Sequence, residues 1–424
     1  MRELFARRET AIMFKLACVL LLLLLGLPAA CREAPPAARL EQVLTASWQS
    51  YVRHFISAVG QVMIPEEGGG TISEAQAYAL LRAVWAGDEP TFGRVYGWTH
   101  RHLSRSGSHG DALLAWRWGR LPDGAWGVRD ANSAADADLD YALALLLAHR
   151  RGWRAPAGLP DYLEESRRVQ AAILAKEVVR LDNGALLLTP GNWHEPRPPY
   201  LVNPSYFAPA AYQLFAPPLS GPGPGAAPPP EGARADSMDG AAGRHHAWLR
   251  LRRDSYVLLE QLGRGLHPQT GLGLFPDWCR VDGMGVATPA PEKDTRFGSE
   301  AVRLPFRVAL DGLWFRHPKA ARLLGGRFLT FFKGQWATHG RLAAVYNYDG
   351  SPAVDYESPV LYAGVLAGAL GAGDREFAGE LAQKILGCYH EKGDGAYFEA
   401  PDHYYANNWA WLGLALYAGW IKSF

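Results

Sequence analysis

Apolar residues recur at helical spacing along most of the chain. From Leu40 the pattern runs through Trp48, Tyr51 and Phe55, and strand-like alternation of apolar and polar residues is scarce. Glycine, proline and aromatic residues gather between the helical segments. Further helices are predicted at about 73–87, 91–103, 108–118, 134–150, 159–177, 205–214, 247–263, 299–315, 317–333, 356–370, 373–389 and 404–421. The pattern predicts an all-α architecture of paired helices.

One domain, residues 39–424, accounts for this pattern. The stretch 217–243 contains proline and glycine runs such as GPGPG and PPP, and it has too little apolar surface to order itself. We interpret it as a flexible surface insertion. A boundary between two domains is the alternative, although helical pairs of the same style continue on both sides of the stretch.

The N-terminus has the features of an export signal. Arg7, Arg8 and Lys15 precede an apolar run from Leu16 to Leu27. The run is shorter than the roughly 20 apolar residues that a transmembrane helix needs. The mature chain is therefore expected to leave the cytoplasm.

The apolar run ends in the sequence LPAAC, which resembles a bacterial lipoprotein cleavage box. Cys31 would carry the lipid, although Pro28 departs from the usual pattern and ordinary cleavage near Ala30 is the alternative. Residues 1–31 then form the signal and 32–38 a short tether rich in proline and alanine. The prediction is a periplasmic or outer-membrane lipoprotein held to the membrane by its lipid alone, or else a secreted protein.

Charge and cysteine content exclude several classes of function. Lys and Arg number 43 against 42 Asp and Glu, so a net charge of +1 argues against a nucleic-acid partner. Outside the signal only Cys279 and Cys388 remain, without metal-ligand spacing, and no metal or cofactor is expected. These two thiols could pair in an oxidising compartment or stay free.

Aromatic residues are abundant, with 15 Trp, 18 Tyr and 16 Phe. Most aromatic side chains serve as core, but flat rings also stack on sugars in a binding cleft. Trp126, Trp193, Tyr200 and Trp278 stand beside polar residues in predicted loops, which makes them candidate stacking platforms. Ordinary packing is the alternative for each of them.

Carboxylates stand at the start of two predicted helices. Glu74 opens the helix that follows Gly68–Thr71, where a cap or a favourable interaction with the helix dipole is the ordinary interpretation. In the second helix Asp136 and Asp140 share one face and Asp138 points away from both. The three acids cannot form one solvated stripe, so at least one is expected to point inward, where an unpaired carboxylate is costly.

Several ordered sequence blocks resemble glycoside hydrolase family 8. The segment TISEAQAYALLRAVWAGDEPTFGRVYGWTHRHL is similar to a block of that family, and AADADLDYALALLLA resembles its signature helix. Ala135 and Tyr141 depart from the signature, whereas Asp136 and Asp138 are kept. The blocks LLAWRWG, VNPSYFAPA and GLFPDW follow in the family's order. The resemblance is close over about residues 60–315 and favours the branch associated with bacterial cellulose synthesis.

The resemblance implies a fold, an activity and roles for the carboxylates. It implies an (α/α)6 barrel and an endo-acting, inverting hydrolase of β-1,4-glucan. Its expected partners are the polysaccharide substrate and an exopolysaccharide synthesis or export machinery. Glu74 would be the general acid, and Asp136 would bind the sugar ring being cleaved. A helix N-terminus lowers a carboxyl pKa, so burial and a neighbouring carboxylate such as Asp136 must raise that of Glu74. Asn132 would also contact substrate.

The general base implied by the resemblance is Glu300, which stands where the family's main branch has Asp. The extra methylene moves the carboxylate by about 1.5 Å, which an inverting arrangement can accommodate because its two carboxyl groups stand about 6.5–9.5 Å apart. Arg303 would contact substrate and keep Glu300 ionised, and Tyr206 would help to hold the attacking water. Asp294 and Glu292 are the reserve candidates for the base.

Three alternatives remain open from sequence. Glu300 could merely cap a helix in a catalytically weak protein. The protein could be a non-catalytic polysaccharide-binding lipoprotein that uses the same cleft. The same chemistry could also act on chitosan or xylan.

Overall fold

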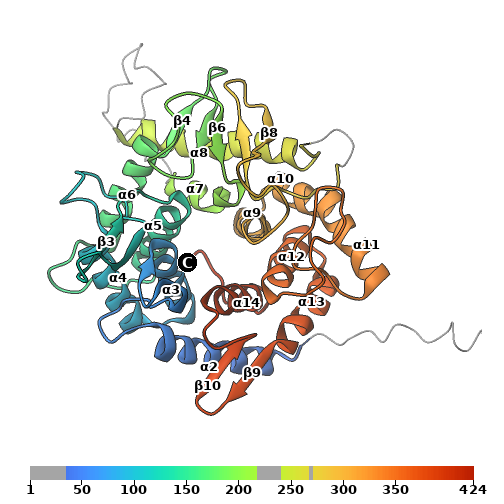
Figure 1. Ribbon diagram of the computed structural model, residues 1–424, viewed down its shortest axis with the longest axis horizontal. Coiled ribbons are helices and arrows are strands. Elements are labelled where there is room, and N and C mark those ends of the chain that lie inside the picture. The colour runs from blue at the N-terminus through green and yellow to red at the C-terminus, as the bar shows by residue number, and fades with distance from the viewer. Residues whose placement is uncertain (1–34, 217–239, 267–270) are drawn as a thin grey trace, which may run out of the picture. The chain divides into compact units, whose positions relative to one another are not determined.

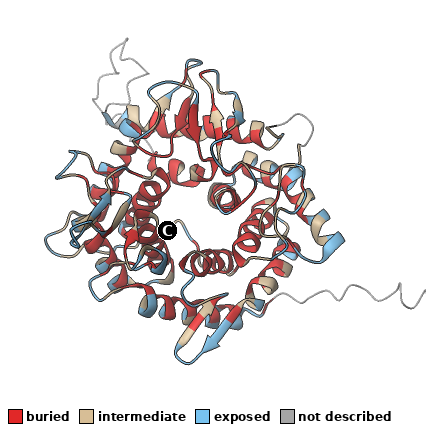
Figure 2. Ribbon diagram, in the orientation of Figure 1, coloured by how far each residue is buried: buried red, intermediate tan, exposed pale blue. Residues whose placement is uncertain are grey.

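Two kinds of helix make up the computed structural model, which describes residues 35–216, 240–266 and 271–424. Inner helices are buried nearly all round because apolar residues cover every face, as at Ala135–Ala148 and Pro359–Gly371. They form the inner ring, coloured red in Figure 2. The inner helices are α3 (Ser73–Ala86), α5 (Ala135–Arg150), α7 (Pro209–Phe215), α9 (Leu304–Phe315), α12 (Pro359–Ala372) and α14 (Tyr404–Tyr417).

Outer helices are amphipathic and cover the inner ring (Figure 1). In the first of them Leu40, Leu44, Trp48 and Tyr51 face inward while the opposite face is exposed. The outer helices are α2 (Ala37–Phe55), α4 (Glu89–Leu103), α6 (Tyr162–Lys176), α8 (Gly240–Leu262), α10 (Pro318–Leu323), α11 (Leu329–His339) and α13 (Arg375–Gly387). Outer and inner helices alternate along the chain, with α10 and α11 as two pieces of one interrupted outer helix, and this arrangement is the predicted (α/α)6 barrel.

Short antiparallel strands connect the helices. The sheets are β1 (Thr71–Ile72) with β2 (Arg117–Arg120) and β3 (Trp126–Asp130), β4 (Val178–Arg180) with β5 (Leu186–Leu188), β6 (Tyr200–Val202) with β7 (Cys279–Val281) and β8 (Ala287–Pro289), and β9 (Tyr389–Lys392) with β10 (Gly395–Phe398). In the first sheet Thr71 pairs with Trp118, which joins the start of α3 to the hairpin beside it. These hairpins shape the rim of the barrel.

One predicted helix is wrong and another is interrupted. Residues 108–118 form a loop that leads into β2, because Trp118 and its neighbours pair with β1 and β3 instead of closing helical turns. The predicted helix at 317–333 is broken into α10, a π-helical turn η4 (Leu324–Phe328) and α11. Gly326 has a non-helical ψ of −127° there, a conformation that glycine adopts at little steric cost.

Parts of the predicted organisation lie outside the described residues. These are the export signal and Cys31, in residues 1–34, and most of the insertion, in residues 217–239. Residues 240–243 belong to α8, not to the insertion. Within the described ranges, no helix is long and apolar enough to cross a membrane. Both remaining thiols are free, with Cys279 buried and Cys388 partly buried.

Gly364 on α12 lets a functional segment pack closely against the inner ring. A β-carbon at this position would lie 2.3 Å from the carbonyl oxygen of Val302. Val302 belongs to the short 3-10 helix η3 (Ala301–Arg303), which leads into α9. The absent side chain at residue 364 therefore fixes how deeply η3 sits in the barrel.

Candidate active site

A cleft of about 620 Å³ opens where several inner helices begin. Its lining includes Glu74 from the first turn of α3, Asp136 from the first turn of α5 and Tyr404 from the first turn of α14. Glu300, just before η3 and α9, lines the same cleft. The volume is within the range of about 300–1,000 Å³ that ligand sites occupy. The topology thus gathers helix starts that are far apart in sequence.

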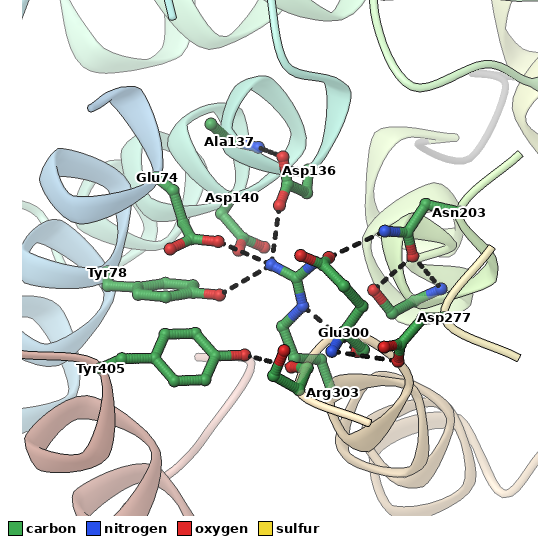
Figure 3. A network of polar contacts seen from close by, with 12 residues as sticks. Glu74, Tyr78, Asp136, Ala137, Asp140, Asn203, Asp277, Glu300, Arg303 and Tyr405 are labelled. Carbon is green, nitrogen blue, oxygen red and sulfur yellow. Dashed lines mark hydrogen bonds and ion pairs between the residues drawn. The ribbon is translucent and has the colours of Figure 1, made fainter. Parts of the chain in front are cut away.

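Three carboxylates of the cleft converge on one guanidinium (Figure 3). Nη1 of Arg303 donates to Oε2 of Glu74 at 2.6 Å and to Oδ2 of Asp136 at 3.0 Å. Nη2 of Arg303 contacts Oε2 of Glu300. Glu74 and Glu300 therefore face each other across a single side chain.

Arg303 lies beneath the cleft and does not line it. Its side chain is 2% exposed, and it is absent from the cleft wall that Glu74, Asp136 and Glu300 form. The ring of Tyr206 stacks over its guanidinium at 5.2 Å. The sequence predicted Arg303 as a substrate contact, but its burial makes it a support for the three carboxylates.

A second buried ion pair extends this cluster without changing its net charge. Nη1 and Nη2 of Arg307 donate to the two carboxylate oxygens of Asp140 at 2.6 and 2.7 Å. The cluster then holds four acids, Glu74, Asp136, Asp140 and Glu300, against two guanidinium groups. Such an excess of buried negative charge favours keeping a proton on at least one carboxyl group.

The pKa values of the cluster follow from burial. Burial raises the pKa of Glu74 above its ordinary value, Arg303 and the hydrogen bond from Tyr404 oppose the rise, and Glu300 and Asp140 add to it. Burial likewise raises the pKa of Asp136 to about 7, against the lowering effect of Arg303. Glu74 in turn raises the pKa of Asp136, so the protonation states of these two neighbouring carboxyl groups depend on each other.

Tyr404 and Tyr405 are site residues that the sequence did not reveal. The hydroxyl of Tyr404 donates to Oε1 of Glu74 at 2.6 Å, and that of Tyr405 donates to the carbonyl oxygen of Ser299 at 2.6 Å. Both tyrosines line the cleft. The sequence feature that could have identified these tyrosines is their position at the start of an inner helix, a position that Glu74 and Asp136 share.

A buried aspartate shapes the turn that carries Glu300. Oδ1 of Asp277 accepts hydrogen bonds from the backbone nitrogens of Gly298, Glu300 and Ala301. Nδ2 of Asn203 donates to Oε2 of Glu300 at 2.8 Å. The Glu300 side chain is 33% exposed against 14% for Glu74, so it is the better hydrated of the two acids.

The residues predicted to bind substrate divide into two groups. Trp193, Trp278, Tyr206 and Asn132 line the cleft, together with Trp116, which was not predicted as a platform. Trp126 is 44% exposed but lies on β3 outside the lining. The prediction for Tyr200 is wrong, because this residue is only 6% exposed and packs in the core on β6. Its strand pairing with Val281 turns the ring away from solvent.

The reserve candidates for the base do not reach the cleft. Asp294 pairs with Arg296 at 2.6 Å, and Glu292 pairs with Arg280 at 2.6 Å, both near the surface. A backbone hydrogen bond and Arg280 lower the pKa of Glu292, and Arg296 lowers that of Asp294. Among the described residues, no group of three or more His, Cys, Asp or Glu side chains could hold a metal ion.

Comparisons with known proteins bear on this arrangement. Residues 18–220 match the family model described as glycosyl hydrolases family 8. An endoglucanase from Salmonella typhi is 33% identical over 282 residues, which are 66% of this chain and 65% of that protein. The chain belongs to glycoside hydrolase family 8. The family 8 chain spans just under two thirds of that relative's length.

Solved structures agree with the fold of this family 8 chain. A family 8 endoglucanase from Klebsiella pneumoniae matches with a TM-score of 0.63 at 21% identity, over 89% of this chain and 99% of that one. Rex8A from Paenibacillus barcinonensis, solved with xylose, matches with a TM-score of 0.66 at 21% identity, over 92% and 94%. The (α/α)6 fold is thereby confirmed. The segment matched by the family model contains Glu74, Asp136 and Tyr206 and ends before Glu300.

Proposed function

We propose that this protein is an endo-acting, inverting glycoside hydrolase that cleaves β-1,4-glucan. The observation that carries the proposal is the approach of Glu74 and Glu300 to one guanidinium from opposite sides, at the wall of one cleft. Inverting hydrolysis needs an acid on one side of the sugar and a base with its water on the other. A groove lined by Trp116, Trp193 and Trp278 offers flat faces for sugar rings.

Glu74 is the general acid in this proposal. Its raised pKa favours the protonated form that an acid must bring to the glycosidic oxygen. Tyr404 and Arg303 oppose that form, and they stabilise the carboxylate once the proton has left. The two effects together keep Glu74 able to give up its proton and to regain it after each turnover.

Glu300 is the general base in this proposal. Its greater exposure leaves room for a water beside the carboxylate, and Asn203 with Asp277 holds the side chain and its turn in place. Asp136 faces the same space and would bind hydroxyl groups of the sugar whose bond is cleaved. Its carboxylate can also stabilise the positive charge that develops on that sugar in the transition state.

Reducing-end release tests the activity directly. Purified protein is incubated with carboxymethyl-cellulose, lichenan, xylan and chitosan, beside Glu74→Gln and Glu300→Gln variants. We expect cleavage of the β-1,4-glucans by the wild type and a loss of at least a hundredfold in both variants, because each loses a proton-transfer group. Preference for xylan or chitosan would move the proposal to that substrate. A wild type as inert as Glu74→Gln that still binds glycan would identify a binding protein instead.

We also propose that the protein is exported and attached to the cell envelope by a lipid on Cys31. The support is the basic segment, the apolar run and the LPAAC sequence of the N-terminus. Such a location would place the cleft beside an exopolysaccharide synthesis or export machinery. Incorporation of a labelled fatty acid into the wild type but not into Cys31→Ser, with release of the variant from the membrane fraction, is the expected result. Equal fractionation without label in either protein would contradict lipidation.

A further inference from the structure

Two fully buried acids lie behind one wall of the cleft. Asp138 on α5 and Glu177, directly after α6, are both 0% exposed, and Oδ2 of Asp138 and Oε2 of Glu177 have no other hydrogen-bond partner. The two carboxyl groups lie close enough for each to affect the pKa of the other. The second oxygen of Asp138 accepts from the backbone nitrogen of Leu114 at 2.8 Å. The second oxygen of Glu177 accepts from the hydroxyl of Ser133 at 2.6 Å. Two carboxylates in contact can hydrogen bond only if they share a proton.

Ser133 connects this acid pair to the cleft. Its backbone nitrogen donates to Oδ1 of Asn192 at 2.7 Å, and its hydroxyl accepts from the backbone nitrogen of Asn192 at 3.0 Å. Its carbonyl oxygen accepts from Nε1 of Trp193 at 3.1 Å. Trp193 and Ser133 both line the cleft, and Asp136 begins its helical turn three residues after Ser133. The pair therefore supports the segment that presents an aromatic platform.

Glu177 also holds the same loop through its backbone. Its carbonyl oxygen accepts from the backbone nitrogen and from the hydroxyl of Thr189, each at 2.8 Å. The Thr189 hydroxyl further contacts the carbonyl oxygen of Gly191 at 3.2 Å. Glu177 thus holds one end of residues 189–193 directly through its backbone, and the other end indirectly through the hydrogen bond from Ser133 to its side chain.

The charges around the pair do not neutralise it. Burial raises the pKa of both acids, that of Glu177 to about 8. Glu177 raises the pKa of Asp138 further, whereas hydrogen bonding to Ser133 and Asp138 lowers that of Glu177. Arg105, from the loop after α4, lowers both pKa values but is itself paired with Asp111. Asp136 raises the pKa of Glu177. The remaining titratable neighbours are the phenols of Tyr141 on α5 and Tyr212 on α7.

We propose that the Asp138–Glu177 pair positions residues 189–193, which carry Trp193, at the wall of the cleft. Loss of the proton that the two acids share, in alkaline solution, weakens polysaccharide binding and spares bond cleavage. Without the proton, two anions would stand in contact in a dry environment and repel each other. Separation of the two acids would displace Ser133, and residues 189–193 would lose the hydrogen bonds that hold them in place. Glu74 and Glu300 take no part in this network, so the effect should fall on KM more than on kcat. This inference rests on the proposed glycan-cleaving function.

Binding to an inactive enzyme tests the proposal without turnover. The dissociation constant of cellopentaose is measured for Glu74→Gln between pH 6.5 and 9.5, alone and combined with Asp138→Asn. Asparagine can keep both hydrogen bonds, accepting from Leu114 and donating to Glu177, but carries no proton that titrates. We expect the dissociation constant of Glu74→Gln to rise at least tenfold at alkaline pH and that of the combined variant to stay within about threefold.

Hydrogen exchange of residues 189–194 tests the loop without any glycan. After correction for the intrinsic pH dependence of exchange, protection should fall at alkaline pH in the wild type and stay constant in Asp138→Asn. Glu165→Gln is the matched control, because Glu165 on α6 is another buried glutamate but contacts His100 and Arg168. It should behave as the wild type. If Asp138→Asn does not fold, Glu177→Gln replaces it, because glutamine keeps an acceptor for Ser133.

The outcomes separate this inference from the proposed function. Alkaline loss of binding and of loop protection in a protein that cleaves no glycan would refute the hydrolase and uphold the positioning device. A hydrolase whose binding and loop protection are independent of pH would refute the device alone. Alkaline loss that persists in full in Asp138→Asn would also refute it. If no glycan binds, the exchange experiment decides.

Discussion

The close packing of Gly364 against η3 allows a sharp prediction about fold and site together. An alanine β-carbon at residue 364 would stand 2.3 Å from the Val302 carbonyl oxygen and 2.5 Å from its Cγ2 atom. Nonbonded atoms prefer about 3.5–4.0 Å, so η3 or α12 must move by roughly 1 Å. Arg303 follows Val302 directly and would move with it.

The magnitude follows from two opposing effects. Overpacking of a tight core costs about 1–3 kcal/mol, and replacing glycine by alanine within a helix returns about 0.5–1 kcal/mol. We therefore expect Gly364→Ala to lower the free energy of unfolding by about 1–2 kcal/mol. A displacement near 1 Å at the reacting groups can cost about a hundredfold in rate. The variant should lose roughly ten- to a hundredfold in kcat/KM on carboxymethyl-cellulose.

Urea unfolding followed by circular dichroism, together with reducing-end assays, measures both effects. Gly334→Ala on α11 is the matched control, because a β-carbon there meets no atom within 4 Å. It should gain up to about 1 kcal/mol of stability from helix propensity and keep full activity. A Gly364→Ala variant that is as stable and as active as the control would refute the argument that this contact sets the position of Arg303.

Three further substitutions have defined expectations. Tyr404→Phe removes a hydrogen bond that favours ionised Glu74, so the pKa of Glu74 should rise. The alkaline limb of the pH profile of kcat/KM should then move to higher pH. Tyr405→Phe, which removes a hydrogen bond to Ser299 instead, should leave that limb in place. Asp140→Asn leaves Arg307 without its buried anion and should cost about 3–5 kcal/mol in the free energy of unfolding by urea, and an unchanged unfolding midpoint would contradict the assigned pair. Trp193→Ala should raise the dissociation constant of cellopentaose about tenfold, because it removes a stacking face. Tyr200→Phe, in the core, should leave that constant unchanged. Equal effects of the two substitutions would show that Trp193 does not stack on the glycan.

The sequence predicted the parts of the site that depend on local patterns. Glu74 and Asp136 stand at helix starts within recognisable blocks, and both line the cleft. Tyr404 reaches Glu74 across 330 positions of chain, and no spacing in the sequence announces such a contact. The burial of Arg303 under three carboxylates was equally hidden, because it depends on how the inner helices close into a ring.

Local patterns also failed where tertiary pairing overrides them. Residues 108–118 have helical spacing of apolar residues, yet Trp118 gains more from pairing with β1 and β3 than from a helical turn. Tyr200 looked like an exposed ring among polar neighbours, but strand pairing with β7 turns it into the core. Both errors concern the rim of the barrel, where short strands replace helices.

The stereochemistry of the first product tests the central claim most directly. Proton NMR of a cello-oligosaccharide digest, recorded within the first minutes and before mutarotation, reports the anomer that the enzyme releases. Attack by a water held at Glu300, with Glu74 as the acid on the opposite side, predicts that the α-anomer appears first from the β-linked substrate. Initial release of the β-anomer would contradict the account, because retention requires a covalent intermediate and a nucleophile in place of the water.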